Sequence, residues 1–430
     1  MKILRFCELT EKAQAEIISR PPVNLSQISD TVDEVLRRVR EEGDKAVFDY
    51  EERFDHVRLQ SLAVTEAEMD EAETLVGEPL KQAIALAHAN ISRFHAAQQH
   101  DMPKVETCPG VVCWQKSVPI EKVGLYIPGG TAPLFSTVLM LATPARLAGC
   151  GEIVLCTPPD RNGRIHPAIL VAARQAGVSR IFKAGGVQAI GAMAYGTESV
   201  PKVHKIFGPG NRFVMAAKQQ VSLADVAIDM PAGPSEVCVV ADEQANPVFV
   251  AADLLSQAEH GSDSQVLFIT TSEQMLTSVQ QEVERQLRQL PRQDFARQSL
   301  DNSCFVLVPT TADAIALANR YAPEHLILQT QDYEHLASLV VNAGSVFLGP
   351  YACESAGDYA SGTNHTLPTH GYATAYSGVN LDSFCRKITF QHLTEQGIRS
   401  IGQAVELMAE AEQLEAHRNA MSVRRKTIDY

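Results

Sequence analysis

The sequence predicts an α/β protein with two parallel-sheet units, and two observations lead to this fold class. From about residue 111, short runs rich in β-branched and aromatic residues alternate with longer apolar runs of helical character. A second series with the same rhythm begins near residue 235. Strand–helix alternation is typical of βαβ units, whose parallel strands are covered by helices on both faces. Two such series predict two units.

Nearly every expected strand of the first series ends in a turn rich in glycine and proline. These turns are IPGG (127–130), TPPD (157–160), AGG (184–186), FGPG (207–210) and MPAGPSE (230–236). Ligands of parallel sheets bind at the carboxyl ends of the strands, where the amino end of the next helix favours an anion such as a pyrophosphate. The common GxGxxG pattern of dinucleotide sites does not occur at these turns. The turns therefore indicate either a nucleotide site or ordinary tight turns.

Both ends of the chain lack the alternating pattern. About the first 105 residues are polar, with apolar residues at helical spacing at Ile28, Val32, Val35, Leu36 and Val39. Thr65 and Glu68 fit a capping box at the start of a further helix. The stretch from Gly378 onward is polar and helical, without a strand pattern, and its apolar content is too low for a core of its own.

Charge and composition exclude several classes of protein. The formal net charge is −14, which repels nucleic acids and anionic membranes. No apolar run approaches the roughly 20 residues needed to cross a bilayer. The first residues, MKILRFCELTEKAQAEI, carry charges where a signal peptide needs an apolar core. We therefore expect a cytoplasmic protein that binds neither nucleic acid nor membrane.

The nine cysteines are scattered, and none forms a CxxC pair. In a reducing compartment this pattern indicates free thiols, neither a disulfide framework nor a zinc–thiolate site. Cys113 and Cys150 could act as nucleophiles, or they could be small buried apolar residues.

A polar stripe on an otherwise apolar helix is the first candidate site. The helix expected over 247–260 has Asn246 as a possible N-cap. Asp253, Gln257 and His260 are spaced four and three apart on it, so they share one face. A polar stripe on a buried helix needs hydrogen bonds, a metal or a ligand to satisfy it.

Three further segments carry acidic and imidazole side chains. The segment 349–369 lacks helical and strand periodicity and contains Glu354, Asp358 and His365, which favours a functional loop. Pro323 breaks a helix directly before Glu324 and His325, and neighbouring side chains can converge at such a break. Near the C-terminus, Glu412 and His417 lie five apart on an expected helix, which also fits a solvated face.

These residues suggest a metal site. Together, Gln257, His260, Asp358 and His417 would provide nitrogen and oxygen ligands without a thiolate. Such a set suits Zn²⁺, Mn²⁺ or Co²⁺.

Several long segments resemble the signature blocks of the histidinol dehydrogenases. They are IDMPAGPSEV, DLLSQAEHGSDSQV, APEHL and ESAGDYASGTNHTLPT. The likeness runs through VGLYIPGGTAPLFSTVLMLATPARLAGC and SVPKVHKIFGPGN to EAHRNAMSVR, so it covers nearly the whole chain. The segment VSLADVAIDM is shorter than expected for the family, which affects the length of a loop and not the chemistry.

The resemblance implies a site shared between two subunits. One Zn²⁺ per subunit would be bound by Gln257, His260 and Asp358, with His417 from the other subunit of a homodimer. Glu324 and His325 would be the proton acceptors. Contacts to L-histidinol would come from Ser235, Gln257, His260, His325, Asp358, Glu412 and His417, and contacts to NAD from Tyr126, Gln188 and Asn211.

The implied fold is two incomplete Rossmann-like units with small N- and C-terminal helical arms in an intertwined homodimer. The expected divisions are an N-terminal arm over 1–22, a metal and catalytic unit over 23–119 plus 236–377, an NAD unit over 120–235, and an arm over 378–430 that reaches the partner.

The implied activity is the oxidation of L-histidinol to L-histidine, the last step of histidine biosynthesis, in two NAD-dependent steps through an enzyme-held aldehyde. A zinc hydrolase could use the same metal site without a dinucleotide. A non-catalytic nucleotide-binding protein would use the glycine-rich turns without the ligand set.

Overall fold

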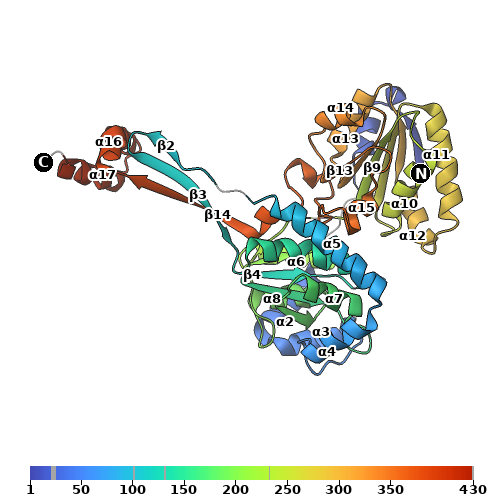
Figure 1. Cartoon of the computed structure of the whole chain (residues 1–430), viewed down its shortest axis with the longest axis horizontal. Coiled ribbons are helices and arrows are strands. Elements are labelled where there is room, and N and C mark those ends of the chain that lie inside the picture. Colours follow the sequence, from blue (N-terminus) through green and yellow to red (C-terminus); the bar gives the residue numbers. More distant parts are fainter. Residues whose placement is uncertain (21–25, 100–101, 130–131, 232, 429–430) are drawn as a thin grey trace.

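The computed structural model of the chain describes residues 1–20, 26–99, 102–129, 132–231 and 233–428. This part of the chain forms two α/β units and a long arm that projects from one of them (Figure 1). Each unit contains one parallel sheet, which confirms the predicted α/β fold class with two parallel sheets. Among the described residues, no helix is long and apolar enough to span a bilayer.

The first unit is built on a six-stranded sheet whose neighbouring strands are all parallel. In spatial order the strands are β1 (Lys2–Arg5), β11 (Cys304–Leu307), β10 (Gln265–Thr270), β9 (Glu236–Ala241), β12 (His325–Gln329) and β13 (Ser345–Leu348). One face is covered by α10 (Pro247–Ala258), α11 (Glu273–Leu287) and α12 (Gln293–Asp301), and the other by α1 (Glu11–Ile17), α13 (Thr311–Tyr321) and α14 (Tyr333–Ser338). Every residue of β9 and β12 is buried, because helices cover both faces.

The N-terminal segment differs from the predicted helical arm over 1–22. Residues Lys2–Arg5 form the edge strand β1, which pairs in parallel with β11, and Leu4 packs against the core of the first unit. The helix α1 is capped by Thr10 and buries Ile17 in the same core. A four-residue strand with a basic residue at each end has too little apolar character to be recognised in the sequence, and it forms because β11 offers a free edge.

The second unit is built on a five-stranded parallel sheet. In spatial order its strands are β6 (Arg180–Lys183), β5 (Glu152–Thr157), β4 (Lys122–Tyr126), β7 (Lys205–Phe207) and β8 (Ala227–Ile228). One face is covered by α4 (Glu66–Leu75), α5 (Glu78–Ala96), α6 (Phe135–Ala148) and α7 (Pro167–Gln175), and the other by α2 (Ser26–Glu42), α3 (Asp44–Phe54), α8 (Gly186–Tyr195) and α9 (Arg212–Ser222). The predicted capping box of Thr65 and Glu68 is confirmed at the start of α4.

The helices α2 to α5 pack on the five-stranded sheet, so the predicted grouping of 23–119 with 236–377 is wrong for these helices. The apolar face of α2, centred on Val35, contacts α8 and α9. The sequence shows that this face exists, but an amphipathic helix can cover either sheet, and its periodicity does not say which. The limits of the other domains stay predictions.

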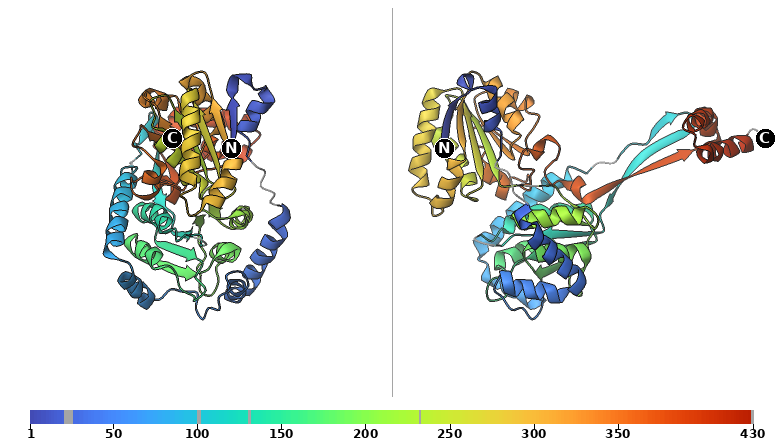
Figure 2. Two further views of the ribbon diagram at one scale, coloured as in Figure 1. Left: turned by 90° about the vertical axis from the view of Figure 1, so that its right-hand side faces the viewer. Right: turned by 180° about the vertical axis from the view of Figure 1, so that it is seen from behind.

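The arm is a three-stranded antiparallel sheet that ends in two helices and projects away from both parallel sheets (Figure 2). In spatial order its strands are β14 (Cys385–Leu393), β3 (Val111–Pro119) and β2 (Val105–Cys108), and its helices are α16 (Glu395–Ala411) and α17 (Glu415–Ile428). The strand β14 contradicts the prediction that the stretch from Gly378 has no strand. The side chains from Arg386 to His392 are exposed, so β14 has no alternation of buried and exposed residues, and it is held by its pairing with β3.

Candidate active site

Polar residues predicted in the sequence meet at the amino ends of β9 and β12. Ser235 directly precedes β9, Glu324 directly precedes β12, and His325 is the first residue of β12. The helix α10 runs back from the carboxyl end of β9, so its own carboxyl end brings Gln257 and His260 to this edge of the sheet. Residues from three separate parts of the chain therefore meet at one place.

The helix α10 begins as the sequence predicts. Asn246 is its N-cap and accepts a hydrogen bond from the backbone N–H of Val248. The buried Asp253 on this helix accepts a hydrogen bond from Nε2 of Gln329 at 3.1 Å. Hydrogen bonding alone therefore satisfies Asp253. Gln257 and His260, the other two residues of the predicted polar stripe, remain as candidate site residues.

Glu324 and His325 lie together because the chain turns sharply before β12. The helix α13 ends at Tyr321, and the next residue, Ala322, has a φ of 50°, in the left-handed region that non-glycine residues rarely adopt. Oε2 of Glu324 lies 3.8 Å from Nδ1 of His325, and both side chains are buried. The prediction that the break at Pro323 brings a carboxylate and an imidazole together is confirmed.

Two donors hold the carboxylate of Glu324 in place. The backbone N–H of Glu236 donates to Oε2 of Glu324 at 2.9 Å. Nε2 of Gln257 lies 3.4 Å from the same oxygen and 3.3 Å from Nδ1 of His325. An amide that donates through its nitrogen keeps its oxygen as a possible metal ligand. Gln257 can therefore support the Glu324–His325 pair and still serve a cation.

The segment after β13, predicted as a functional loop, contains the short helix α15 (Glu354–Tyr359). Asp358 lies one turn after Glu354 on this helix, so both carboxylates face one side. Together with His260 they offer three ligand atoms within 4.8 Å of one another. Oδ1 of Asp358 also lies 3.5 Å from Nε2 of His325. The sequence-based metal site missed Glu354, although the four-residue spacing of two acidic residues could have indicated it.

The cluster has unsatisfied polar atoms that fit a divalent cation. Nε2 of His325, Oε2 of Glu354 and Oδ1 of Asp358 are buried and have no hydrogen-bond partner in the described part of the chain. Leaving a buried polar atom unpaired costs about 1–3 kcal/mol, so such atoms point to a missing partner. Imidazole nitrogens and carboxylate oxygens without thiolates suit Zn²⁺ and similar ions. His260 is exposed, so the cluster opens to solvent.

The buried charges in the cluster shift one another's pKa values. Burial raises the pKa of Glu324 to about 7 and that of Glu354 to about 8. Burial also disfavours the ionised form of Asp358, but the imidazole of His325 outweighs this effect and lowers the pKa of that carboxyl. Burial lowers the pKa of His325, whereas the surrounding carboxylates outweigh burial and raise it to about 10. The cluster therefore has an excess of negative charge that a cation would offset.

His365 links the cluster to the second unit. Its Nδ1 lies 2.9 Å from the backbone oxygen of Asp358, and its Nε2 lies 3.2 Å from Oγ1 of Thr137. Thr137 lies in the first turn of α6, and residues directly before this helix line the cavity of the second unit. The imidazole of His365 thus connects the cluster of the first unit to helix α6 of the second unit.

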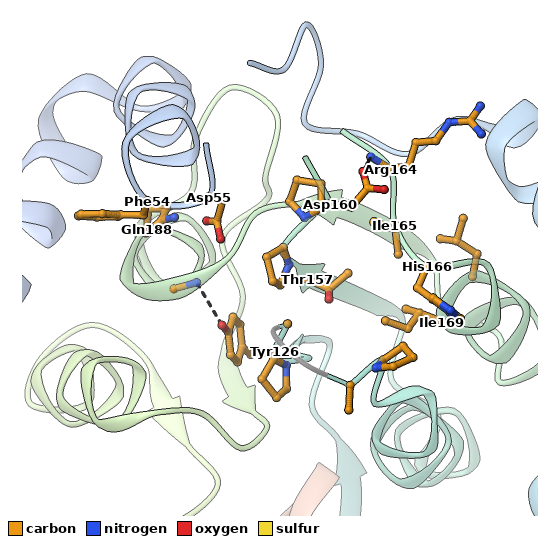
Figure 3. A pocket seen from close by; sticks show the side chains of 18 of the residues that line it. Phe54, Asp55, Tyr126, Thr157, Asp160, Arg164, Ile165, His166, Ile169 and Gln188 are labelled. Carbon is orange, nitrogen blue, oxygen red and sulfur yellow. Dashed lines mark hydrogen bonds between the residues drawn. The ribbon is translucent and has the colours of Figure 1, made fainter. Parts of the chain in front are cut away.

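A cavity of about 1000 Å³ lies at the carboxyl ends of the strands of the five-stranded sheet (Figure 3). Tyr126, Gln188 and Asn211, the three residues predicted to contact NAD, all line it. Tyr126 ends β4, Gln188 lies in the first turn of α8, and Asn211 caps α9. The amino ends of two helices therefore meet at this cavity, where backbone N–H groups favour an anionic ligand.

Glu412 and His417 are not part of the cluster within one chain. Glu412 follows α16 and His417 lies on α17, at the tip of the arm, and both are exposed. Figure 2 shows this tip on the far side of the molecule from the six-stranded sheet. A contribution from these two residues to the cluster would have to come from a second copy of the chain.

The two candidate nucleophilic cysteines lie outside the cluster. Cys150 is buried in the core of the second unit, and burial raises the pKa of its thiol to about 12. Cys113 lies on β3 in the arm. The Cys150 thiol is therefore almost entirely protonated near neutral pH, and the protonated form is a poor nucleophile.

Comparisons with known proteins agree with this geometry. The sequence model of the family described as histidinol dehydrogenase matches residues 18–425. The histidinol dehydrogenase of Bacteroides thetaiotaomicron is 63% identical over 428 residues, which covers 100% of both chains. That of Xylella fastidiosa is 52% identical, and the match covers 99% of each chain. A crystal structure of histidinol dehydrogenase from Elizabethkingia anophelis has a TM-score of 0.97 and 52% identity, covering 100% of this chain and 99% of that chain.

A family match over nearly the full length and identities above half of the positions confirm the resemblance seen in the sequence. The close agreement with a solved structure extends this relationship to the arm as well as to both sheets. The chain therefore belongs to the histidinol dehydrogenase family, whose members use Zn²⁺ and NAD.

Proposed function

We propose that the cluster around His325 oxidises L-histidinol to L-histidine in two NAD-dependent steps, with the intermediate aldehyde held by the enzyme. One observation carries this assignment. Glu324, His325, Gln257, His260 and Asp358 come from three segments of the chain and meet at one edge of the first sheet. A single site with a base, a second carboxylate and a metal-ligand set suits two consecutive oxidations of the same carbon.

Gln257, His260 and Asp358 are proposed to hold the Zn²⁺, with His417 of the partner subunit as a further ligand. A Zn²⁺ held by these residues would supply Lewis-acid stabilisation of the bound substrate and would offset the negative charge of the cluster. The carboxylates that raise the pKa of His325 would then be shared with a cation, which would favour the neutral imidazole.

An intertwined homodimer is proposed to bring the arm of one subunit to the cluster of the other. The arm has little core of its own and exposes the apolar side chains Ile388, Phe390, Leu407 and Met408. Apolar side chains on an extended arm favour burial against another chain. Ser235, beside the cluster, and Glu412 of the partner subunit would then contact L-histidinol from opposite sides. The nine free cysteines fit a reducing compartment such as the cytoplasm.

In the first step, His325 takes the proton of the substrate hydroxyl while a hydride leaves the same carbon for NAD⁺. The imidazole is well placed for this, because Asp358 lies 3.5 Å from its Nε2 and can stabilise the protonated form. Tyr126, Gln188 and Asn211 are proposed to hold the dinucleotide. The cavity that these three residues line favours a dehydrogenase over a zinc hydrolase, which would need no dinucleotide.

In the second step, Glu324 takes a proton from a water molecule as the water oxygen attacks the aldehyde carbon. The resulting gem-diol monoanion loses a hydride to a second NAD⁺, which leaves the carboxylic acid. A pKa of about 7 suits Glu324 to this role, since it can accept and release a proton near neutral pH. Water is preferred over a cysteine because neither candidate thiol lies in the cluster.

The test is the stoichiometry of NADH formation. With limiting L-histidinol and excess NAD⁺, absorbance should report two NADH per substrate consumed, with L-histidine as the product. A chelator should stop the reaction, and added Zn²⁺ should restore it. Hydrolysis of a supplied ester without NADH formation would favour the zinc hydrolase. NAD binding without turnover would favour a non-catalytic nucleotide-binding protein.

A further inference from the structure

A buried carboxylate that the mechanism does not use lies behind the cavity of the second unit. Glu51, on α3, has an exposed fraction of 0%. Its Oε1 accepts a hydrogen bond from the backbone N–H of Gly185 at 2.8 Å and another from Nε2 of Gln188 at 2.9 Å. Burying a carboxyl group is costly, so its two bonds to the turn between β6 and α8 indicate a specific role.

The carboxylate sets the orientation of the Gln188 amide. An ionised carboxyl group only accepts hydrogen bonds, so the nitrogen of the amide must face it and the amide oxygen must point elsewhere. That oxygen is buried and has no hydrogen-bond partner in the described part of the chain. It lies near Gly186 at the amino end of α8, since a Cβ added to Gly186 would be 3.0 Å from it. Gln188 and Gly186 both line the cavity.

We propose that Glu51 is a positioning residue for NAD binding, which holds the Gln188 amide so that its oxygen accepts a hydrogen bond from the dinucleotide. The matching donor is a ribose hydroxyl or the N–H of the carboxamide. The inference rests on the proposed role of Gln188 as an NAD contact. The same carboxylate fixes the N–H of Gly185, and the hydroxyl of Tyr126 accepts from the N–H of Gly186 at 3.1 Å (Figure 3).

Protonation of Glu51 should weaken this arrangement. Burial raises the pKa of Glu51 to about 7, with a smaller contribution from Asp55, the residue directly after the same helix. The other titratable groups that face it are Tyr126 on β4 and Cys156 on β5, and burial raises the pKa of both, so they stay neutral. A protonated carboxyl can donate to the oxygen of an amide, which removes the preference for one amide orientation.

The experiment measures the dissociation constant of NAD⁺ for the zinc-loaded enzyme by calorimetry. Glu51→Met keeps the size of the side chain and removes the acceptor, so the constant should rise about tenfold. Glu51→Gln keeps a carbonyl oxygen and should recover most of the affinity. The wild type should bind NAD⁺ more weakly as the pH falls from about 8 to 6, whereas Glu51→Gln should show a flat profile.

Two controls make the outcome decisive. Glu52→Gln removes the neighbouring charge, which is exposed and paired with Arg58, and should leave NAD⁺ affinity unchanged. Zinc content and the KM for L-histidinol of Glu51→Met should stay close to those of the wild type, which separates positioning from general loss of structure.

The replacement Gln188→Met distinguishes the NAD contact proposed for Gln188 from the positioning role proposed for Glu51. If it leaves NAD⁺ affinity unchanged, the proposed cofactor role of Gln188 is wrong, and the role of Glu51 is wrong with it. If it weakens NAD⁺ binding while Glu51→Met does not, only the positioning role is wrong. The account expects the double variant to bind NAD⁺ no more weakly than Gln188→Met alone.

Discussion

The two candidate sites lie at opposite ends of the strands of their sheets. In the five-stranded sheet the cavity lies at the carboxyl ends of the strands, where α8 and α9 begin. In the six-stranded sheet the cluster lies at the amino ends of β9 and β12, where α10 ends. The helix dipole places partial positive charge at the amino end and partial negative charge at the carboxyl end. The first edge therefore favours an anionic dinucleotide and the second a cation.

The difference places two candidate sites of opposite electrostatic preference in two units of similar architecture. The rule that ligands bind at the carboxyl ends of parallel strands holds for the cavity, where backbone N–H groups at helix ends face the ligand. It does not apply to the cluster, because the candidate ligand atoms there belong to side chains such as His260 and Asp358. His365 connects the two units, because its ring contacts Asp358 beside the cluster and Thr137 on α6.

The largest expected effect is a loss of zinc and turnover at the cluster without a loss of NAD⁺ binding at the cavity. His260→Ala should lose zinc and turnover together, because it removes an imidazole from the ligand set. NAD⁺ affinity should stay near the wild-type value, since the cavity belongs to the other sheet. Elemental analysis and calorimetry measure the two properties separately. Full zinc occupancy in this variant would remove His260 from the metal site.

The next effect separates catalysis from metal binding within the cluster. His325→Ala and Glu324→Gln should retain zinc and lose turnover by about 10²–10⁴-fold, because each removes acid–base assistance. Steady-state rates with metal content measured on the same samples provide the comparison. Zinc loss equal to that of His260→Ala would contradict the separate roles.

The pH dependence of the second oxidation gives a smaller effect. Burial raises the pKa of Glu324 to about 7, and a base acts only when ionised, so the active form is present above this pH and is lost as the pH falls through it. With the aldehyde as substrate, the single-turnover rate should fall about tenfold per pH unit below about 7. A rate that stays level down to about pH 5.5 would exclude Glu324 as this base.

The smallest effect concerns the cysteines. The double variant Cys113→Ala, Cys150→Ala should keep zinc and turnover and lose on the order of 1 kcal/mol of stability, because Cys150 fills part of the core. Activity and thermal denaturation measure both properties. Loss of turnover with zinc intact would mean that the aldehyde is held as a thiohemiacetal.

Much of this organisation could be predicted from the sequence, since periodicity and turns identify the central strands. Asn246 correctly marks the start of α10, and Pro323 correctly marks the end of the helix before β12. The pattern could not show which sheet a helix covers or which strand an edge strand pairs with. The helices α2 to α5 fit either sheet, and β1 and β14 depend on neighbours that offer a free edge. Glu354 was named in the predicted functional loop but left out of the predicted metal site, because its burial beside His260 and Asp358 is visible only in the structure.

We propose that the arm of a second copy of the chain brings His417 to each cluster. Mixing two inactive variants tests this proposal most directly. His325→Ala damages the cluster and His417→Ala damages the arm. In a mixed dimer, the intact cluster of the His417→Ala subunit faces the intact arm of the His325→Ala subunit. The account predicts that unfolding and refolding the two variants together restores activity, at up to one working site per mixed dimer. A mixture that forms dimers and zinc sites but stays inactive would contradict it.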